Sequence, residues 1–172
     1  GNAMHFDAGQ VARYLNEELR ARMAASESSK RSRVWRVEDS ELRIVKELPG
    51  DRPEVALFVT HRPRSLVKPQ IARYLRLLRE GGISVMLIVA ADDVAVELSD
   101  EMLSLVDGAA IRANNGFDFA AWAHIIKLHS ALYNSKILYL LNDSLVGPFN
   151  RQALDDLIHR VRASGSDVIG LV

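Results

Sequence analysis

Apolar runs of strand length alternate along the chain with segments whose apolar residues recur every three or four positions. The runs Val55–Thr60 and Ile83–Ala90 are continuous, which is typical of strands that are covered on both faces. Between them, Val67–Glu80 has its apolar residues at the spacing of one buried helix face, and Gly81 and Gly82 mark its end. The pattern predicts a strand, a helix and a second strand.

The same alternation continues toward the end of the sequence. Ser99 is placed to cap a short helix that runs through Leu105. The remaining predicted elements are a strand at Gly108–Arg112, a helix at Asp118–Leu132, a strand at Lys136–Leu141, a helix at Arg151–Ala163 and a strand at Asp167–Val172. Repeated strand–helix units with right-handed crossovers form a mostly parallel, doubly wound sheet with helices on both faces. We therefore expect an α/β domain over residues 54–172.

The residues before this domain follow a different pattern. Ala8–Met23 spaces its apolar side chains as an amphipathic helix does, and Ser26–Arg33 is polar and serine-rich, as linkers are. Val34–Leu48 holds two short strand-like runs that are able to pair as a small hairpin. We expect residues 4–48 to precede the α/β domain, and residues 1–3 to be left from an expression tag.

Composition and charge narrow the class of protein. The 172 residues carry 22 Lys/Arg and 22 Asp/Glu, a balance that argues against a general nucleic-acid binder. The absence of cysteine excludes disulfides, thiolate metal sites and cysteine nucleophiles, and it is compatible with the cytoplasm. Every apolar run is far shorter than the ~20 residues of a membrane-spanning helix, so no membrane span is expected.

Polar clusters follow four of the predicted strands. Because ligands bind outside the carboxyl ends of the strands in such sheets, the four clusters should share one edge. They are Thr60-His61-Arg62, Ala91-Asp92-Asp93, Ala113–Phe117 and Asn142-Asp143-Ser144. The loop after the first regular strand has no glycine, so a GxGxxG fingerprint is absent, and neither a P-loop nor a hydrolase GxSxG sequence occurs.

Asp143 is the most informative carboxylate because a rigid strand fixes its position. It could bind Mg²⁺ or Mn²⁺, which take oxygen ligands and often only one or two carboxylates besides substrate phosphates. Asn142 and Ser144 could add hydrogen bonds to a ligand. The alternative is that these residues form a plain turn, since Asn, Asp and Ser are all common in turns.

The other candidates also have structural alternatives. Asn114-Asn115-Gly116 is either a turn or part of a ligand site, and Asp118 is either the N-cap of the helix that follows or a ligand contact. Phe119 and Trp122 are expected in the core. Asp92 could bind a ribose or a base, or lie in solvent. Arg62, next to Arg64 and Lys68 in the sequence, could neutralise a phosphate or be an ordinary solvated arginine.

Taken together, "VALFVTH", "RANNGFDFAAWAHII", "ILYLLNDSLVGPF" and "DVIGL" resemble the rhamnan synthesis protein F family of bacterial polysaccharide glycosyltransferases. The resemblance covers about residues 54–172 and is specific in the two central motifs. That family is similar to GT-A-type nucleotide-sugar transferases, which have a Rossmann-like donor-binding half. This sequence departs from the pattern at Ala120, where the family has glycine, and in having one carboxylate, Asp143, where the usual acidic motif has two.

The resemblance implies transfer of a sugar, with rhamnose as the candidate, from a dTDP-, UDP- or GDP-sugar to a glycan of the bacterial cell surface. It implies that Thr60, His61 and Asp92 hold the nucleoside, that Arg112–Asp118 border the donor, and that Asn142-Asp143-Ser144 hold a weakly bound Mg²⁺ or Mn²⁺. Expected partners are the donor, the glycan acceptor and either a second copy or other polysaccharide-synthesis proteins, in the cytoplasm or at the inner face of the membrane.

No residue stands out as a general base, so a second hypothesis remains open. It is a catalytically silent module of the same fold that binds a nucleotide-sugar, a glycan or a protein. A flavodoxin-like or receiver-like module is a third alternative. It is disfavoured because the first strand ends in Thr60-His61, where such modules have an acidic pair or a phosphate loop.

Overall fold

The computed structural model describes residues 17, 36–61, 68–144 and 150–166. The chain divides into two compact units, residues 1–36 and 37–172, and the fold given below is that of the second. The predicted amphipathic helix at residues 8–23 lies outside the described residues except for Glu17, which is helical and exposed. The linker at residues 26–33 and the predicted strand at residues 167–172 also lie outside them.

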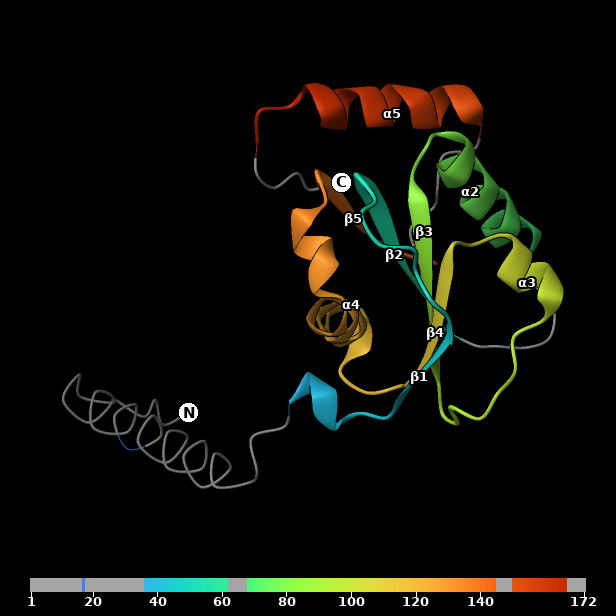
Figure 1. Ribbon diagram of the computed structural model, residues 1–172, viewed down its shortest axis with the longest axis vertical. Coiled ribbons are helices and arrows are strands. Elements are labelled where there is room, and N and C mark those ends of the chain that lie inside the picture. Colours follow the sequence, from blue (N-terminus) through green and yellow to red (C-terminus); the bar gives the residue numbers. More distant parts are fainter. Residues whose placement is uncertain (1–16, 18–35, 62–67, 145–149, 167–172) are drawn as a thin grey trace, which may run out of the picture. The chain divides into compact units, whose positions relative to one another are not determined.

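The second unit is built on a five-stranded sheet in the order β1-β4-β3-β2-β5 (Figure 1). Strands β2, β3, β4 and β5 run parallel, and β1 pairs antiparallel with β4 at one edge. The strands are β1 (Leu42–Lys46), β2 (Glu54–His61), β3 (Ser84–Ala91), β4 (Gly108–Ala113) and β5 (Ile137–Asn142). The predicted α/β class with a mostly parallel sheet is confirmed.

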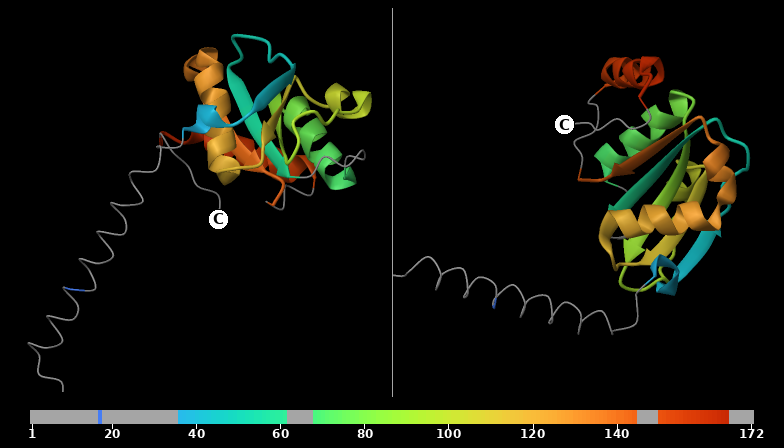
Figure 2. Two further views of the ribbon diagram at one scale, coloured as in Figure 1. Left: turned by 90° about the horizontal axis from the view of Figure 1, so that it is seen from below. Right: turned by 90° about the vertical axis from the view of Figure 1, so that its left-hand side faces the viewer.

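Helices cover both faces of this sheet. Figures 1 and 2 show α2 and α3 on one side of the strands and α4 on the other. The helices are α2 (Pro69–Glu80), α3 (Asp100–Ser104), α4 (Phe117–Leu128) and α5 (Arg151–Ala163), and the short 3-10 helices are η1 (Val37–Asp39) and η2 (Ser130–Asn134). Ser99 caps α3 as predicted, since its Oγ accepts a hydrogen bond from the Met102 amide.

Two hydrophobic cores follow from this layering. Successive side chains of a strand point to opposite faces, so β2 contributes Ala56 and Phe58 to one core and Val55, Leu57 and Val59 to the other. The first core includes side chains of α2, α3 and α5, and the second includes side chains of α4 and η2. The continuous apolar run of β2 is therefore explained by burial on both faces, as its sequence indicated.

The prediction of a hairpin at Val34–Leu48 is wrong, as far as the structure describes these residues. Val37–Asp39 forms a turn of 3-10 helix, and Leu42–Lys46 pairs with β4 instead of with the residues before it. The sheet therefore begins before residue 54, and β1 belongs to the α/β unit. The apolar–polar alternation of β1 predicted a strand but carried no information about its partner, because pairing depends on residues about 70 positions away.

Helix α5 is tied to the amino-terminal edge of the sheet through a buried carboxylate. Glu54 is 8% exposed, and the guanidinium of Arg162 donates to both of its oxygens, at 2.8 and 3.0 Å. The Tyr139 hydroxyl donates to Glu54 Oε2 at 2.9 Å. Burial, together with this hydrogen bond, raises the pKa of Tyr139. The arrangement connects β2, β5 and α5 at the edge opposite the predicted site.

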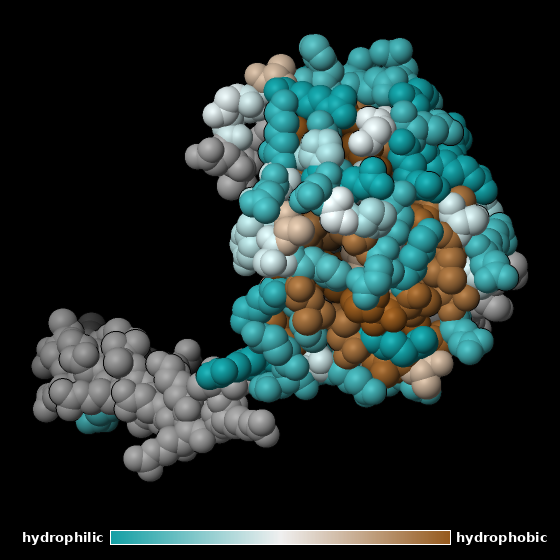
Figure 3. Space-filling model, viewed as in Figure 1, coloured by the Kyte–Doolittle hydropathy of each residue, from teal (hydrophilic) through white to brown (hydrophobic). Residues whose placement is uncertain are grey.

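Within the described residues, no helix has the length and apolar character that crossing a bilayer requires. Figure 3 shows mostly hydrophilic residues over α5 and α2, and apolar residues between α3 and α4, where β1 and β4 form the edge of the sheet. Partly buried side chains of β1 pack against both cores there.

Candidate functional site

The strand order places the predicted site at a change of direction in the chain. From β2 the chain moves to β3 and then to β4, and α4 then carries it back across the opposite face to β5, on the other side of β2. The carboxyl ends of β2 and β5 therefore meet where the winding reverses. In open α/β sheets this is where ligands bind.

Side chains from the ends of β2 and β5 contact each other there. Thr60 Oγ1 donates a hydrogen bond to Asp143 Oδ2 at 2.7 Å, and the His61 amide lies 3.4 Å from the same oxygen. The Asp143 amide in turn donates to the Val59 carbonyl at 3.1 Å, which continues the β2–β5 ladder by one residue. Asp143 is thus positioned by backbone and side chain together, and it lies at the carboxyl edge as the sequence predicted.

A second carboxylate joins this cluster from α4. Asp118 Oδ1 lies 2.6 Å from His61 Nε2, and Asp118 Oδ2 accepts a hydrogen bond from Asn142 Nδ2 at 2.6 Å. The His61 side chain is 36% exposed and that of Asp118 is 19% exposed, so solvent or a ligand can reach both. Ser144 Oγ donates to Asn142 Oδ1 at 2.9 Å. We call Thr60, His61, Asp118, Asn142 and Asp143 the carboxyl-edge cluster.

Of the two alternatives for Asp118, the one in which it caps α4 is wrong. The N-cap is Gly116, with φ of 76°, and Phe117 follows with φ of 55°. Two successive left-handed residues turn the chain sharply into the helix, and a residue with no Cβ adopts this conformation without strain. Asp118 therefore lies in the first helical turn with its carboxylate directed to the sheet edge. The Asn115-Gly116 dipeptide, which is typical of turns, correctly indicated a turn at this point.

Arg112, predicted to border the donor, is instead a buried support for the loop before α4. It is 1% exposed, and its NH1 donates to the carbonyls of Asn115 at 2.6 Å and Ala113 at 3.0 Å. Its NH2 donates to Ser40 Oγ at 2.9 Å, and Ser40 Oγ donates to Asn115 Oδ1 at 2.6 Å. Burial lowers the pKa of Arg112. The guanidinium is thus engaged in shaping the loop.

The network around Arg112 includes residues that the sequence did not single out. Its Nε donates to His124 Nδ1 at 3.3 Å. Burial, and then the nearby positive charge of Arg112, lower the pKa of His124. No local signal marks Ser40 or His124 for this role, because only the pairing of β1 with β4 brings Ser40 to the loop.

The remaining predicted residues lie along the same edge but do not join the cluster through side chains. Asn114 donates its amide hydrogen to the Ala91 carbonyl at 2.9 Å, which places it beside the end of β3, and Asp92 follows that end. Asn114 and Asp92 are both exposed. Arg62 lies outside the described residues. The structure thus brings the described candidates to one edge and joins six of them, since Ser144 also contacts Asn142.

The cluster offers limited ligation to a divalent cation. One oxygen of Asp143 is engaged by Thr60, and both oxygens of Asp118 accept hydrogen bonds. The described residues contain no group of three or more His, Asp or Glu side chains that could hold a metal ion. A cation there would take Asp143 as its protein carboxylate and would need phosphate oxygens and water for the rest, a set that fits Mg²⁺ or Mn²⁺ with a diphosphate.

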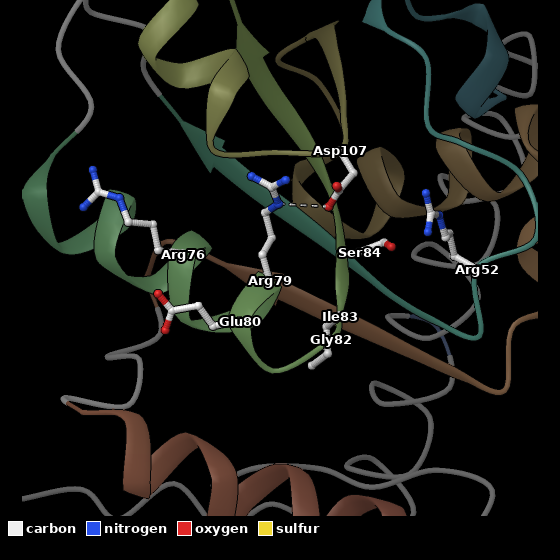
Figure 4. A pocket seen from close by; sticks show the side chains of 8 residues that line it. All are labelled: Arg52, Arg76, Arg79, Glu80, Gly82, Ile83, Ser84 and Asp107. Atoms are coloured by element: carbon white, nitrogen blue, oxygen red, sulfur yellow. Dashed lines mark ion pairs between the residues drawn. The ribbon is translucent and has the colours of Figure 1, made fainter.

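A hollow of about 510 Å³ lies at the opposite, amino-terminal edge (Figure 4). It is lined by Arg52, Arg76, Arg79, Glu80, Gly82, Ile83, Ser84 and Asp107. Two of the lining residues form an ion pair with each other, because Arg79 Nε lies 3.4 Å from Asp107 Oδ2. A third, Glu80, forms an ion pair at 3.3 Å with Arg151, which does not line the hollow. None of the predicted site residues lines it. Its place at the amino ends of the strands makes it the weaker candidate for the ligand site.

Phe119, expected in the core, is 78% exposed, whereas Trp122 is buried as expected. Trp122 Nε1 donates to the Leu57 carbonyl at 3.1 Å, which holds α4 against β2. The helical spacing alone could not separate the two, because apolar residues lie on nearly every side of α4.

Comparison with known proteins assigns no family to this chain: no protein-family model, no curated protein and no solved structure matches it. The functional argument therefore depends on the fold, the carboxyl-edge cluster and the sequence resemblance.

Proposed function

We propose that this chain binds a nucleotide-sugar at the carboxyl edge of its sheet, as the donor-binding part of a glycosyltransferase of bacterial polysaccharide synthesis. The observation that carries the proposal is the cluster in which Thr60 contacts Asp143, and His61 and Asn142 contact Asp118. Three segments far apart in the sequence, the ends of β2 and β5 and the start of α4, supply polar side chains at the point where the winding of the sheet reverses. The resemblance to the rhamnan synthesis protein F family supports sugar transfer, and rhamnose is the sugar it favours.

In this proposal, each part of the edge has a separate role. Asp143 and a bound divalent cation face the diphosphate, and Asp92, at the end of β3, faces the nucleoside. The departing nucleoside diphosphate gains negative charge in the transition state, and fixed positive charge stabilises it. His61 and Asn142 hold the Asp118 carboxylate, so that it can accept hydrogen bonds from the hydroxyl groups of a sugar.

A catalytically silent module of the same fold is the second candidate. The observation that favours it is that both oxygens of Asp118 and one oxygen of Asp143 already have partners within the protein. A network of this kind can hold α4 and the strand ends in place without a ligand. Such a module would bind a nucleotide-sugar, a glycan or a protein without transferring a sugar.

Thermal unfolding in the presence of dTDP, UDP or GDP, with and without Mn²⁺, tests the proposal. A ligand that binds only the folded state at 100 times its Kd adds about 2.7 kcal/mol of stability, which is roughly 5–10 °C in Tm for a chain of this size. We expect one of the three to raise Tm by this order, and Mn²⁺ to increase the rise. In Asp143→Asn, which keeps an acceptor for Thr60, the Mn²⁺-dependent part should disappear.

Asp156→Asn, an exposed carboxylate change on α5, is the matched control and should respond as the wild type does. Equal Mn²⁺ effects in Asp143→Asn and the wild type would remove Asp143 as the metal ligand. If no nucleotide raises Tm, nucleotide-sugar binding is wrong and the interaction module is favoured. Release of free sugar or of nucleoside diphosphate from a bound donor would separate the transferase from a silent binder.

A further inference from the structure

Two phenylalanines at the start of α4 are the most exposed large apolar side chains of the described residues. Phe117 is 83% exposed and Phe119 is 78% exposed, and they flank Asp118 of the carboxyl-edge cluster. Single exposed apolar residues are common on protein surfaces. These two differ because they adjoin a polar cluster at the edge where ligands of α/β sheets bind.

The backbone at Phe117 has a conformation that is strained for a side chain of this size. Its φ of 55° is in the left-handed region, where a bulky residue is an outlier that costs on the order of 1–2 kcal/mol. Glycine or asparagine would adopt this conformation more readily. Strained residues concentrate at ligand sites, where the surrounding structure enforces them. An exposed phenyl ring at a strained position has no core contact that would explain its presence.

Phe119 is held in a defined orientation despite its exposure. Its ring lies edge-on to that of Trp122, with centroids 5.3 Å apart and an interplanar angle of 74°. Trp122 is itself fixed by its hydrogen bond to the Leu57 carbonyl. A ligand that packs on Phe119 therefore meets a preorganised surface and loses little side-chain entropy on binding.

A third apolar side chain lies next to the cluster on β5. Leu140 is 43% exposed and is two residues before Asn142, so both point to the face of the sheet that α4 covers. Asn142 contacts Asp118 on that face. We call Phe117, Phe119 and Leu140 the apolar rim. Exposed apolar side chains thus lie within two residues of the polar side chains of the cluster.

We propose that the apolar rim packs against the apolar face of a pyranose ring while Asp118 binds hydroxyl groups of the same sugar. The face of an aromatic ring carries partial negative charge, which attracts the partially positive C–H groups on one face of a sugar. Each oxygen of Asp118 accepts one hydrogen bond from the protein and retains a lone pair for a hydroxyl. The inference rests on the proposed function, which supplies the sugar either as part of the donor or as the acceptor glycan.

Calorimetric titration of paired ligands tests this inference. The ligands are dTDP-rhamnose, UDP-glucose and GDP-mannose, each beside its nucleoside diphosphate, and a rhamnose trisaccharide without nucleotide. The variants are Phe117→Ala, Phe119→Ala and, as matched control, Tyr133→Ala, which removes a 72% exposed aromatic ring from η2. Because the removed rings are exposed, the variants should fold, and a thermal melt of each checks this.

We expect the two phenylalanine variants to bind a nucleotide-sugar roughly three- to ten-fold more weakly than the wild type, the usual range for one aromatic contact. Binding of the matching nucleoside diphosphate should change less than two-fold, and Tyr133→Ala should bind both ligands as the wild type does. If the trisaccharide binds and the phenylalanine variants lose it, the rim contacts the acceptor; if only the nucleotide-sugar shows the loss, it contacts the donor sugar.

The remaining outcomes separate this inference from the proposed function. Equal weakening of nucleoside diphosphate and nucleotide-sugar would mean that the rim binds the base, which overturns the inference and keeps the function. Unchanged nucleotide-sugar and trisaccharide binding in both phenylalanine variants also overturns the inference alone. Trisaccharide binding that depends on the rim, without any nucleotide binding, keeps the inference and removes the donor site. No binding of any ligand by the wild type overturns both.

Discussion

Arg112 and His124 show how a single buried pair shapes the candidate site without contacting a ligand. Arg112 holds the carbonyls of Ala113 and Asn115, and through Ser40 it also fixes the Asn115 side chain. His124 accepts a hydrogen bond from Arg112 through Nδ1, which is possible only while that nitrogen is unprotonated. The neutral imidazole is therefore part of the loop structure.

This arrangement predicts a stability that depends on the protonation of His124. Burial and the charge of Arg112 lower its pKa in the folded state below the ordinary 6.5, while Glu38 raises it less. The unfolded chain therefore binds a proton first as pH falls, so His124 contributes stability above about pH 6.5 that is lost as the pH drops below it. The loss should be visible in urea unfolding midpoints measured between pH 7.5 and pH 5.

His124→Gln isolates this contribution, because an amide oxygen can accept the hydrogen bond from Arg112 but does not titrate. We expect the variant to lose no more than roughly 1 kcal/mol at pH 7.5, because that is the net worth of the hydrogen bond if the amide makes it less well than the imidazole. The gap between variant and wild type should narrow toward pH 5. A gap that stays constant over this range would show that His124 does not titrate in coupling with folding.

The residues at the ends of the strands show which features of the site a sequence can indicate and which it cannot. Asn142, Asp143 and Thr60 were placed correctly at the edge, because each lies at the end of an apolar strand of clear length or directly after it. Arg112 has the same kind of position, but its side chain points to the α4 face, where Ser40 and His124 enclose it. Which face a strand's last residue takes depends on register, and register depends on distant partners.

At the scale of elements, β4 depends on a close approach that only glycine permits. A Cβ added to Gly108 would lie 2.6 Å from Met86 Sδ and 2.9 Å from Leu48 Cβ. Gly108 opens β4, and Met86 is its partner on β3. The residues that follow β1 therefore pack directly over the start of β4, next to the second core.

We expect Gly108→Ala to destabilise the protein by roughly 1–3 kcal/mol, as overpacking of a core does. Gly50→Ala is the matched control, because a Cβ there has no atom within 4 Å, and it should stay within about 0.5 kcal/mol of the wild type. Urea unfolding of the two variants under one condition makes the comparison. Equal stability of the two variants would mean that Leu48 and Met86 move aside at little cost.

The elements also divide clearly into those that periodicity could predict and those it could not. The long apolar runs of β2 and β3 and the amphipathic spacing of α2 and α5 were predicted within a few residues, because one or both faces are buried. Helix α4 ends at Leu128 and continues as a separate 3-10 helix, where one helix through Leu132 was predicted. Apolar residues on both sides of the break concealed it in the sequence.

At the scale of the whole molecule, the fold and the candidate site both lie in one of the two units. All five strands of the sheet, the two cores and the carboxyl-edge cluster are formed by residues from 37 onward. Helix α5 is joined to the sheet inside the same unit by the contacts of Glu54 and Arg162. Folding and ligand binding should therefore be properties of this unit alone.

A chain of residues 35–172 tests this independence. We expect it to unfold in a single transition with Tm within roughly 2–4 °C of the full chain, the shift that corresponds to about 1 kcal/mol at this size. Any nucleotide that stabilises the full chain should raise the Tm of the shorter chain by the same amount, because the cluster is retained. Circular dichroism and the nucleotide titration provide the two measurements. A folded shorter chain that no longer responds to the nucleotide would place part of the ligand site in residues 1–34, whereas an unfolded one would show that the first unit stabilises the sheet.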